Sequence, residues 1–184
     1  AQRRAKALFD LCAGFVYSQI LLACVRLRLF EMLAAGPQDV NEIAARLALP
    51  PEAAQRLLRA AASLSLLRAL PNDRFALDDL GASMLGNPSV AAFVEHHALL
   101  YDDLRDPVAL LRGETKTRLA QFWPYAAGQS GDDAACGAYS ELMARSQRLI
   151  AEDVLDAYPL DRHRCLLDLG GGEGAFLAAV AARH

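Results

Sequence analysis

A long apolar stretch opens the chain. Residues 3–34 are hydrophobic around most of a helical circumference, and the run from Leu11 to Val25 is interrupted by the polar Ser18 and Gln19. This pattern predicts one helix over residues 3–34. A helix that is apolar on all sides must be buried on several of them, and one small domain offers too little surface to cover it. We therefore expect this helix to pack against a second copy of the chain.

The same stretch lacks the features of a membrane span or a secretory signal. A span needs roughly 20 predominantly apolar residues, and this run closes at Arg26 and Arg28. A secretory signal needs small residues at a cleavage site after its apolar core, whereas Leu29 and Phe30 follow here. The sequence therefore predicts no transmembrane segment.

The next region combines two helical periods with two short strand-like runs. Apolar positions predict helices at 40–47 and 52–64, separated by a turn at 49–51 that contains two prolines. Residues 66–70 and 74–77 predict two strands around a tight turn. Helix, turn, helix and hairpin in this order is typical of a winged helix.

A winged helix often binds DNA, which would make the protein a nucleic-acid-binding module. A reader helix should expose several basic or amide side chains. The region offers few of them, and nearby carboxylates oppose them: Gln55, Arg56, Arg59, Arg68 and Arg74 against Glu52, Asp73, Asp78 and Asp79. The net charge of −3 also provides no field that would recruit nucleic acid. We expect a packing and dimerisation platform, with DNA binding as the alternative.

Helical and aromatic patterns continue to residue 158. Residues 90–101 and 107–111 predict two shorter helices, and residues 133–158 predict a long one. Before the long helix, residues 122–125 read Phe-Trp-Pro-Tyr. Such a cluster is most often core, because aromatic rings dominate buried area. The alternative is that these three aromatic residues form the wall of an apolar ligand pocket.

The last segment carries a glycine-rich turn between an apolar run and a helix. Residues 165–169 predict one buried strand, and residues 175–182 predict a helix. Glycine occupies positions 170, 171, 172 and 174 between them. Strand, glycine turn and helix is how an open α/β sheet begins a nucleotide site. Glycines permit positive φ and close backbone approach, and the helix N-terminus offers unpaired N–H groups.

Two ligand classes compete for this loop. Gly170, Gly172 and Gly174 fit the spacing of adenosylmethionine sites, whereas Gly170, Gly172 and Ala175 fit the looser dinucleotide spacing. Asp168 favours the first class, because a carboxylate attracts ammonium and sulfonium groups, while a pyrophosphate is an anion. A strand-to-helix turn without any ligand is the third interpretation.

Composition and the metal-binding residue types narrow the class further. The 184 residues are 54% hydrophobic and 22% charged, as in a folded globular protein. The cysteines are scattered and form no C-x-x-C pair: Cys12, Cys24, Cys136 and Cys165. Neither a zinc site nor a disulfide framework is indicated, which fits a reducing cytoplasm. His96 and His97 would diverge by about 100° on a helix, so no metal site is predicted.

Several runs of residues resemble one enzyme family. The successive runs LFEML (29–33), IAARL (43–47), RLLR (56–59) and FAL (75–77) resemble the N-terminal dimerisation domain of the caffeic-acid-type O-methyltransferases. The run LDLGGGEG (167–174) is similar to the first adenosylmethionine motif of that family. The runs YDDLRDPVALLRG (101–113), FWPY (122–125) and MARSQ (143–147) resemble its bacterial hydroxyneurosporene, or demethylspheroidene, branch in carotenoid synthesis.

The resemblance implies methyl transfer from S-adenosyl-L-methionine to a hydroxyl of a hydrophobic acceptor. The branch implies a hydroxylated acyclic carotenoid, with an aromatic or polyketide hydroxyl as the alternative. It also implies a homodimer, located in the cytoplasm or peripheral to the membrane because the acceptor is lipophilic. The cofactor would contact Asp168, Gly170, Gly171, Gly172, Gly174 and Ser146, and the acceptor would contact Trp123, Tyr139 and Met143.

The implied fold is a mostly α dimerisation domain with a winged-helix element, followed by the first strand, loop and helix of a Rossmann-like α/β methyltransferase domain. The predicted boundaries are residues 1–113 for the first domain, 114–160 for linker helices along the active-site cleft, and 161–184 for the start of the cofactor domain.

One part of the family pattern is missing from these residues. The ribose-binding acidic residue expected about 20 positions after the loop and the catalytic histidine of the family would both lie beyond His184. None of the histidines here matches that motif: His96, His97, His163 and His184. The catalytic residue is therefore not assigned, and we expect the sequence to be a fragment that shows no turnover alone.

Overall fold

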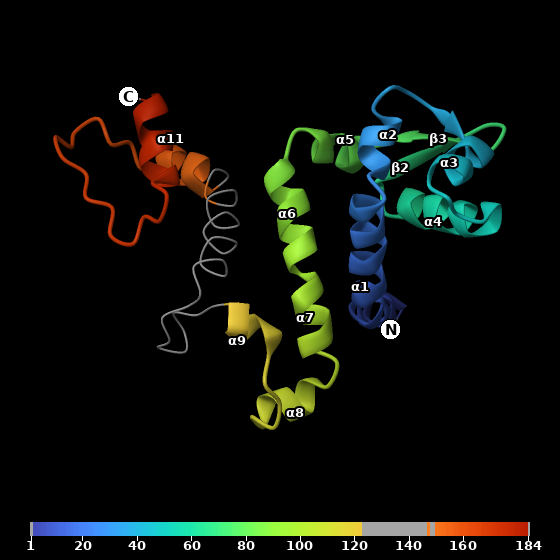
Figure 1. The fold of residues 1–184 in the computed structure, drawn as a ribbon, viewed down its shortest axis with the longest axis horizontal. Helices are drawn as coiled ribbons and strands as arrows, with labels where there is room; N and C mark the ends of the chain where they lie inside the picture. The colour runs from blue at the N-terminus through green and yellow to red at the C-terminus, as the bar shows by residue number, and fades with distance from the viewer. Residues whose placement is uncertain (1, 123–146, 148–149, 184) are drawn as a thin grey trace. The chain divides into compact units, whose positions relative to one another are not determined.

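The computed structural model describes residues 2–122, 147 and 150–183. The chain forms two compact units, Ala1–Glu95 and His96–His184 (Figure 1). The first unit holds the sheet and most of the buried core, and the second carries the glycine loop. The domain boundaries at 113 and 160 stay predictions.

Two helices replace the single helix predicted for residues 3–34. Helix α1 (Gln2–Arg26) ends before α2 (Leu29–Leu33), and Arg28 between them has φ 52° and ψ 38° in the left-handed region. The single-helix prediction is therefore wrong at this point. The break has a packing reason, because Leu29 and Leu33 of α2 lie 0% and 2% exposed in the core. The change of chain direction at Arg28 allows α2 to pack in this core.

The predicted pair of helices and the turn between them are confirmed. Helix α3 (Val40–Arg46) begins with a capping box: Asp39 Oδ1 accepts the Asn41 N–H at 2.8 Å, and the Asp39 N–H points to Glu42 Oε2 at 3.4 Å. Helix α4 (Pro51–Ser63) begins with a proline at its first position, where no intrahelical N–H is needed.

A three-stranded antiparallel sheet follows these helices. Strands β2 (Leu67–Leu70) and β3 (Arg74–Leu77) form the predicted hairpin, in which Ala69 pairs with Phe75. The sequence did not reveal β1 (Gln38–Asp39), which pairs with the other edge of β3 and gives the order β1-β3-β2. Two residues carry too little periodicity to be recognised. The winged-helix assignment stays a prediction, although helix, turn, helix and hairpin occur in the expected order.

The core of the first unit lies between the sheet and α1–α4. Its side chains come from every one of these elements except β1, and the largest that are fully buried are Phe75, Leu29, Leu33, Ile43, Leu58, Leu67 and Cys24. Phe75 sits on the central strand and is 2% exposed. The hairpin is therefore held by burial on its inner face as well as by its ladder.

Two further helices complete this unit. Helix α5 (Asp79–Leu85) packs on β2, β3 and α2, and α6 (Pro88–His96) follows it. Arg26 Nε at the end of α1 donates to Glu95 Oε2 at 3.1 Å, which joins α1 to α6. The helix predicted at 90–101 is divided, since α6 ends at His96 and α7 (Ala98–Asp103) begins two residues later.

The second unit contains α7, α8 (Pro107–Leu111) and α9 (Arg118–Phe122), then residues 150–157 in helical conformation and α11 (Ala175–Arg183). The prediction of a short helix at 107–111 is confirmed. Of the long helix predicted at 133–158, residues 133–146 and 148–149 lie outside the described part of the chain.

The strand predicted at 165–169 is not formed. These residues have no regular structure, and every strand in the described part of the chain belongs to the β1–β3 sheet. A strand is held by a hydrogen-bonded neighbour, and the described residues supply none here. Leu167 and Leu169 are consequently 76% and 85% exposed. The loop and the helix that follow were predicted correctly.

Candidate functional site

The glycine loop has alternating left-handed residues. Gly170, Gly172 and Gly174 have φ of 75°, 55° and 76°, and a side chain at any of them would meet no atom within 4 Å. Their requirement for glycine is conformational, because L residues rarely adopt these angles. The Gly174 N–H donates to the Gly171 carbonyl at 2.8 Å, which closes the turn immediately before α11.

Asp168 lies folded against this loop. Its Oδ2 is buried and has no hydrogen-bond partner among the described residues. The carboxylate sits over Gly171, where a Cβ would lie 2.5 Å from Asp168 Cγ and 2.9 Å from Oδ1. An unpaired buried polar atom is costly, so such atoms in a folded protein call for an explanation.

The residues of the loop fit the amino-acid end of S-adenosyl-L-methionine. A buried carboxylate oxygen without a donor can accept from an ammonium group, and a charged donor makes that hydrogen bond strong. The first N–H groups of α11 have no intrahelical acceptor and favour a carboxylate. Bare glycine backbone then allows a ligand to approach closely. This loop therefore offers an acceptor and donors to a zwitterion within a few residues.

Two side-chain contacts beside the loop were not indicated by the sequence. Tyr158 Oη and His163 Nε2 lie 2.8 Å apart in the connection before the loop, with their rings stacked at 5.6 Å. Asp156 and Arg183 form an ion pair between the helical residues 150–157 and the end of α11. This pair joins the segments on either side of the loop. A contact between positions 27 residues apart, such as Asp156 and Arg183, leaves no periodic signal in a sequence.

A hollow of about 400 Å³ lies beside the loop, lined by Leu160, Asp161, His163, Arg164, Cys165, Leu166 and Val180. None of the glycines lines it. The hollow is therefore a feature of the connection and of α11 rather than of the predicted cofactor contacts.

The remaining predicted site residues lie outside the described part of the chain. These are Trp123, Tyr139, Met143 and Ser146, so their roles stay predictions. Within the described residues, no group of three or more histidine, cysteine or acidic side chains could hold a metal ion. Burial, with a smaller contribution from His97, lowers the pKa of His96 below its ordinary value of 6.5.

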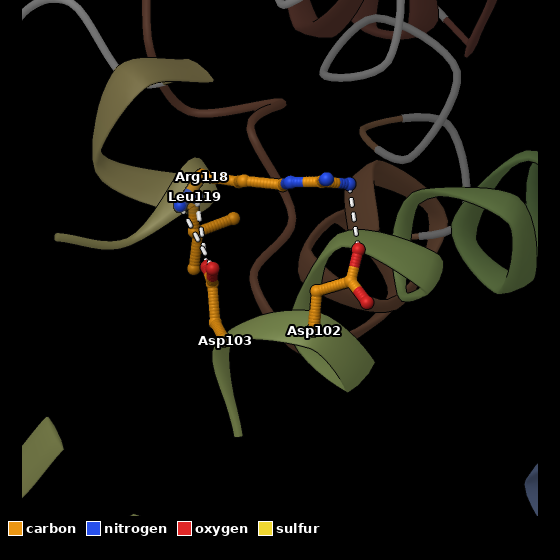
Figure 2. A network of polar contacts seen from close by, with 4 residues as sticks. All are labelled: Asp102, Asp103, Arg118 and Leu119. Atoms are coloured by element: carbon orange, nitrogen blue, oxygen red, sulfur yellow. Dashed lines mark hydrogen bonds and ion pairs between the residues drawn. The ribbon is translucent and has the colours of Figure 1, made fainter. Parts of the chain in front are cut away.

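A second polar arrangement joins α7 to α9 and was not predicted (Figure 2). The two carboxylate oxygens of Asp103 accept the Arg118 and Leu119 N–H groups at 2.8 and 2.9 Å. Asp102 forms an ion pair with the Arg118 side chain at 2.6 Å. Figure 2 shows the Asp103 carboxylate pointing to the start of α9 and the Asp102 carboxylate pointing to the far end of the Arg118 side chain. An apolar hollow of about 310 Å³ adjoins them, lined by Leu100, Asp103, Leu104, Leu110, Thr117, Leu119 and Ala120.

Two family models together match most of the chain. An O-methyltransferase dimerisation domain matches residues 9–87, and an O-methyltransferase domain matches residues 101–184. The chain belongs to the O-methyltransferase family. The first match covers the sheet-containing unit from α1 to α5, and the second covers the glycine loop.

Curated relatives support this O-methyltransferase assignment over nearly all of the chain. It is 49% identical to the demethylspheroidene O-methyltransferase of Cereibacter sphaeroides over 97% of its own length and 48% of that protein. It is 41% identical to the protein of the same name from Rhodobacter capsulatus, over 98% of its length and 46% of the relative. The chain thus spans about half the length of these relatives.

Solved methyltransferases share the fold of this O-methyltransferase chain. One of them is CalO1, a methyltransferase of calicheamicin biosynthesis that was solved with S-adenosylhomocysteine bound. It is 25% identical to this chain with a TM-score of 0.75, and the match covers all of this chain and 56% of CalO1. The family match and this bound cofactor product identify S-adenosyl-L-methionine as the cofactor of the family.

Proposed function

We propose that this protein is an S-adenosyl-L-methionine-dependent O-methyltransferase whose acceptor is a hydroxylated acyclic carotenoid. The observation that carries the proposal is the loop of left-handed glycines beside Asp168, whose buried Oδ2 has no partner among the described residues, in a chain of this family. The carotenoid acceptor is supported by the two demethylspheroidene O-methyltransferases at 49% and 41% identity. An aromatic or polyketide hydroxyl is the alternative acceptor.

The described residues act in this function by binding and orienting. The cofactor supplies an electrophilic methyl group on a sulfonium centre. The Asp168 carboxylate would accept from the ammonium group, and the first N–H groups of α11 would hold the carboxylate of the ligand. Fixing one end of the cofactor by two opposite charges limits its rotation, and orientation of this kind is a large part of catalysis in bimolecular transfer. No proton transfer is assigned to any described residue.

The test has a binding part and a turnover part. Calorimetric titration of the full-length protein with S-adenosylhomocysteine should give saturable binding, and weaker binding by Asp168→Asn identifies the loop as the site. Transfer of a labelled methyl group by the full-length protein should then be measured to a hydroxylated acyclic carotenoid, a catechol and a polyketide phenol. Preference for the carotenoid supports the proposed acceptor, and preference for either phenol replaces it. A folded protein that does not bind S-adenosylhomocysteine contradicts the function itself.

We place the homodimer interface on α1. Its exposed apolar side chains are concentrated in one stretch of the helix: Leu8, Phe9, Leu11, Phe15 and Val16, at 53–79% exposure. Side chains of this size are rarely left in water together, and the match to a dimerisation domain starts at residue 9. A second copy of the chain is therefore the proposed cover.

The same helix is the one described segment that is long and apolar enough to cross a membrane, Arg3–Arg26 with a mean hydropathy of 1.8. Length and composition are shared by membrane spans, signal sequences and core helices of soluble proteins. The absence of a transmembrane segment stays a prediction. A cytoplasmic dimer that touches the membrane surface to collect a lipophilic acceptor is the location we propose.

A further inference from the structure

Gly171 differs from the other glycines of its loop. Its φ lies outside the left-handed region that Gly170, Gly172 and Gly174 occupy, so its backbone conformation does not require glycine. Position 171 requires glycine because the space beside its Cα is already filled. The three atoms nearest to a Cβ at 171 are Oδ2, Cγ and Oδ1 of Asp168, all of them closer than Cβ atoms approach in folded proteins.

The three contacts belong to a side-chain end and not to backbone. A methyl group at 171 would therefore displace the Asp168 carboxylate and leave the turn as it is, with the Gly174 N–H still on the Gly171 carbonyl at 2.8 Å. The displaced carboxylate would also leave the position in which Oδ2 is buried without a donor. The bare Cα at 171 thus permits a carboxylate orientation that is unfavourable for the folded chain alone.

We propose that Gly171 is a positioning residue, whose missing side chain holds open the place in which the Asp168 carboxylate is presented to a cationic group of the ligand. The identity of that ligand as S-adenosyl-L-methionine rests on the proposed function, and the relation between the two residues does not. A buried polar atom without a partner costs free energy, and a site retains such a cost where a bound ligand removes it. An ammonium donor would satisfy Oδ2 and remove that cost.

The first measurement needs no ligand. The variant Gly171→Ala should change the carboxyl carbon chemical shift of Asp168 while the amide shifts of Gly174 and Ala178 stay close to those of the unmodified chain. Its thermal midpoint should be unchanged or higher, because an unpaired carboxylate oxygen has been released to solvent. The matched control Gly172→Ala should move the amide shifts and lower the midpoint, since position 172 needs its φ of 55°. A lowered midpoint in Gly171→Ala, with a disturbed turn, would show a structural glycine and overturn the proposal.

The second measurement is a double-mutant cycle with S-adenosylhomocysteine as the probe. We expect Gly171→Ala and Asp168→Ala each to weaken binding about tenfold, because each removes a charge-assisted contact. Since Asp168→Ala removes all three contacted atoms, Gly171→Ala should cost less than about twofold in its background. Independent, additive effects would contradict the proposal.

The two measurements separate the failures. If the unmodified full-length protein binds no S-adenosylhomocysteine, the proposed function is wrong, while the carboxyl shift and the thermal midpoint still decide whether Gly171 positions Asp168. If the probe binds and the cycle is additive, the function stands and the positioning role is wrong.

Discussion

Gly81 in α5 lies directly against the backbone carbonyl of Leu66, so that a Cβ at 81 would clash with that oxygen and lie 3.1 Å from the carbonyl carbon. The same carbonyl accepts the Asp78 N–H at 3.2 Å, just before α5 begins. Helix α5 approaches the residue just before β2 this closely only because position 81 has no side chain. The contact therefore fixes how α5 packs on the hairpin.

Replacing Gly81 with alanine should destabilise the first unit by about 1–3 kcal/mol, the usual cost of overpacking. Backbone has to move, since the obstructing atom is a carbonyl oxygen and cannot rotate away. Urea unfolding followed by circular dichroism measures the change. Gly86→Ala, at the end of the same helix with open space around it, is the control and should stay within about 0.5 kcal/mol. Equal effects of the two variants would contradict the packing argument.

The start of α3 should depend on Asp39 more than the start of α5 depends on Asp78. Both residues are N-caps in extended conformation, but only Asp39 accepts a capping hydrogen bond, from the Asn41 N–H at 2.8 Å. Asp39→Ala should therefore cost about 0.5–2 kcal/mol of unfolding free energy. Asp78→Ala should cost clearly less. The denaturant midpoints of the two variants, compared at equal slope, measure the difference, and a lower midpoint for Asp39→Ala than for Asp78→Ala is expected.

The two neighbouring aspartates of α7 should have unequal effects. Asp103 holds two backbone N–H groups at the start of α9, whereas Asp102 pairs with the Arg118 side chain where both partners are more than half exposed. Exposed ion pairs contribute little. We expect Asp103→Ala to accelerate hydrogen exchange of the Arg118 and Leu119 amides, and Asp102→Ala to leave it nearly unchanged. Similar acceleration in both variants would mean that the ion pair, and not the cap, orders α9.

Alkaline pH should reveal the burial of Cys24. Burial raises the pKa of its thiol from 9.0 to about 12. The folded chain then keeps a proton that the unfolded chain releases above pH 9, so stability is complete below that pH and falls as the pH rises toward 12. The loss is at most about 1.4 kcal/mol per pH unit. Unfolding curves between pH 8 and pH 11 measure it, and the pH dependence should be flatter in Cys24→Ala than in Cys12→Ala, which alters an exposed thiol.

Charges on the exposed face of α1 should dissociate the proposed dimer. Leu11→Glu and Phe15→Glu place carboxylates at positions that are 79% and 61% exposed in one chain, so each monomer should fold unchanged. Light scattering at fixed protein concentration should then report half the mass. Arg4→Glu, on the same helix outside the apolar stretch, is the control and should remain dimeric. Retention of the larger mass in both glutamate variants would place the interface elsewhere, and sedimentation with lipid vesicles would test the membrane as an alternative cover.

Local patterns were sufficient for the hairpin and for α3, α4 and α8. Alternation around residues 71–73 identified the hairpin, and prolines marked the starts of α4 and α8. These features depend on neighbours in sequence. The break at Arg28 could not be predicted in this way, because residues 27–33 continue the helical pattern and the turn is imposed by burial of α2 in a core assembled from distant residues.

The site shows the same division between local and long-range effects. The spacing of Gly170, Gly172 and Gly174 predicted a ligand loop with positive φ, and all three residues have positive φ. The spacing did not show that Gly171 serves a different purpose, since a contact with Asp168 depends on the path of the chain between them. The strand prediction failed for a related reason. An apolar run indicates burial, but a strand also requires a partner, which its own residues do not reveal.

The left-handed backbone of Arg28 changes the direction of the chain between α1 and α2. Helix α2 is anchored in the core, and α1 leaves it through one left-handed residue that is costly for any side chain but glycine. A two-fold dimer built on α1 contains this turn twice, once in each copy. The angle between the two cores would then depend on the backbone of one arginine and on the packing of α1 against α4, and insertions elsewhere in the surface loops would leave that angle unchanged.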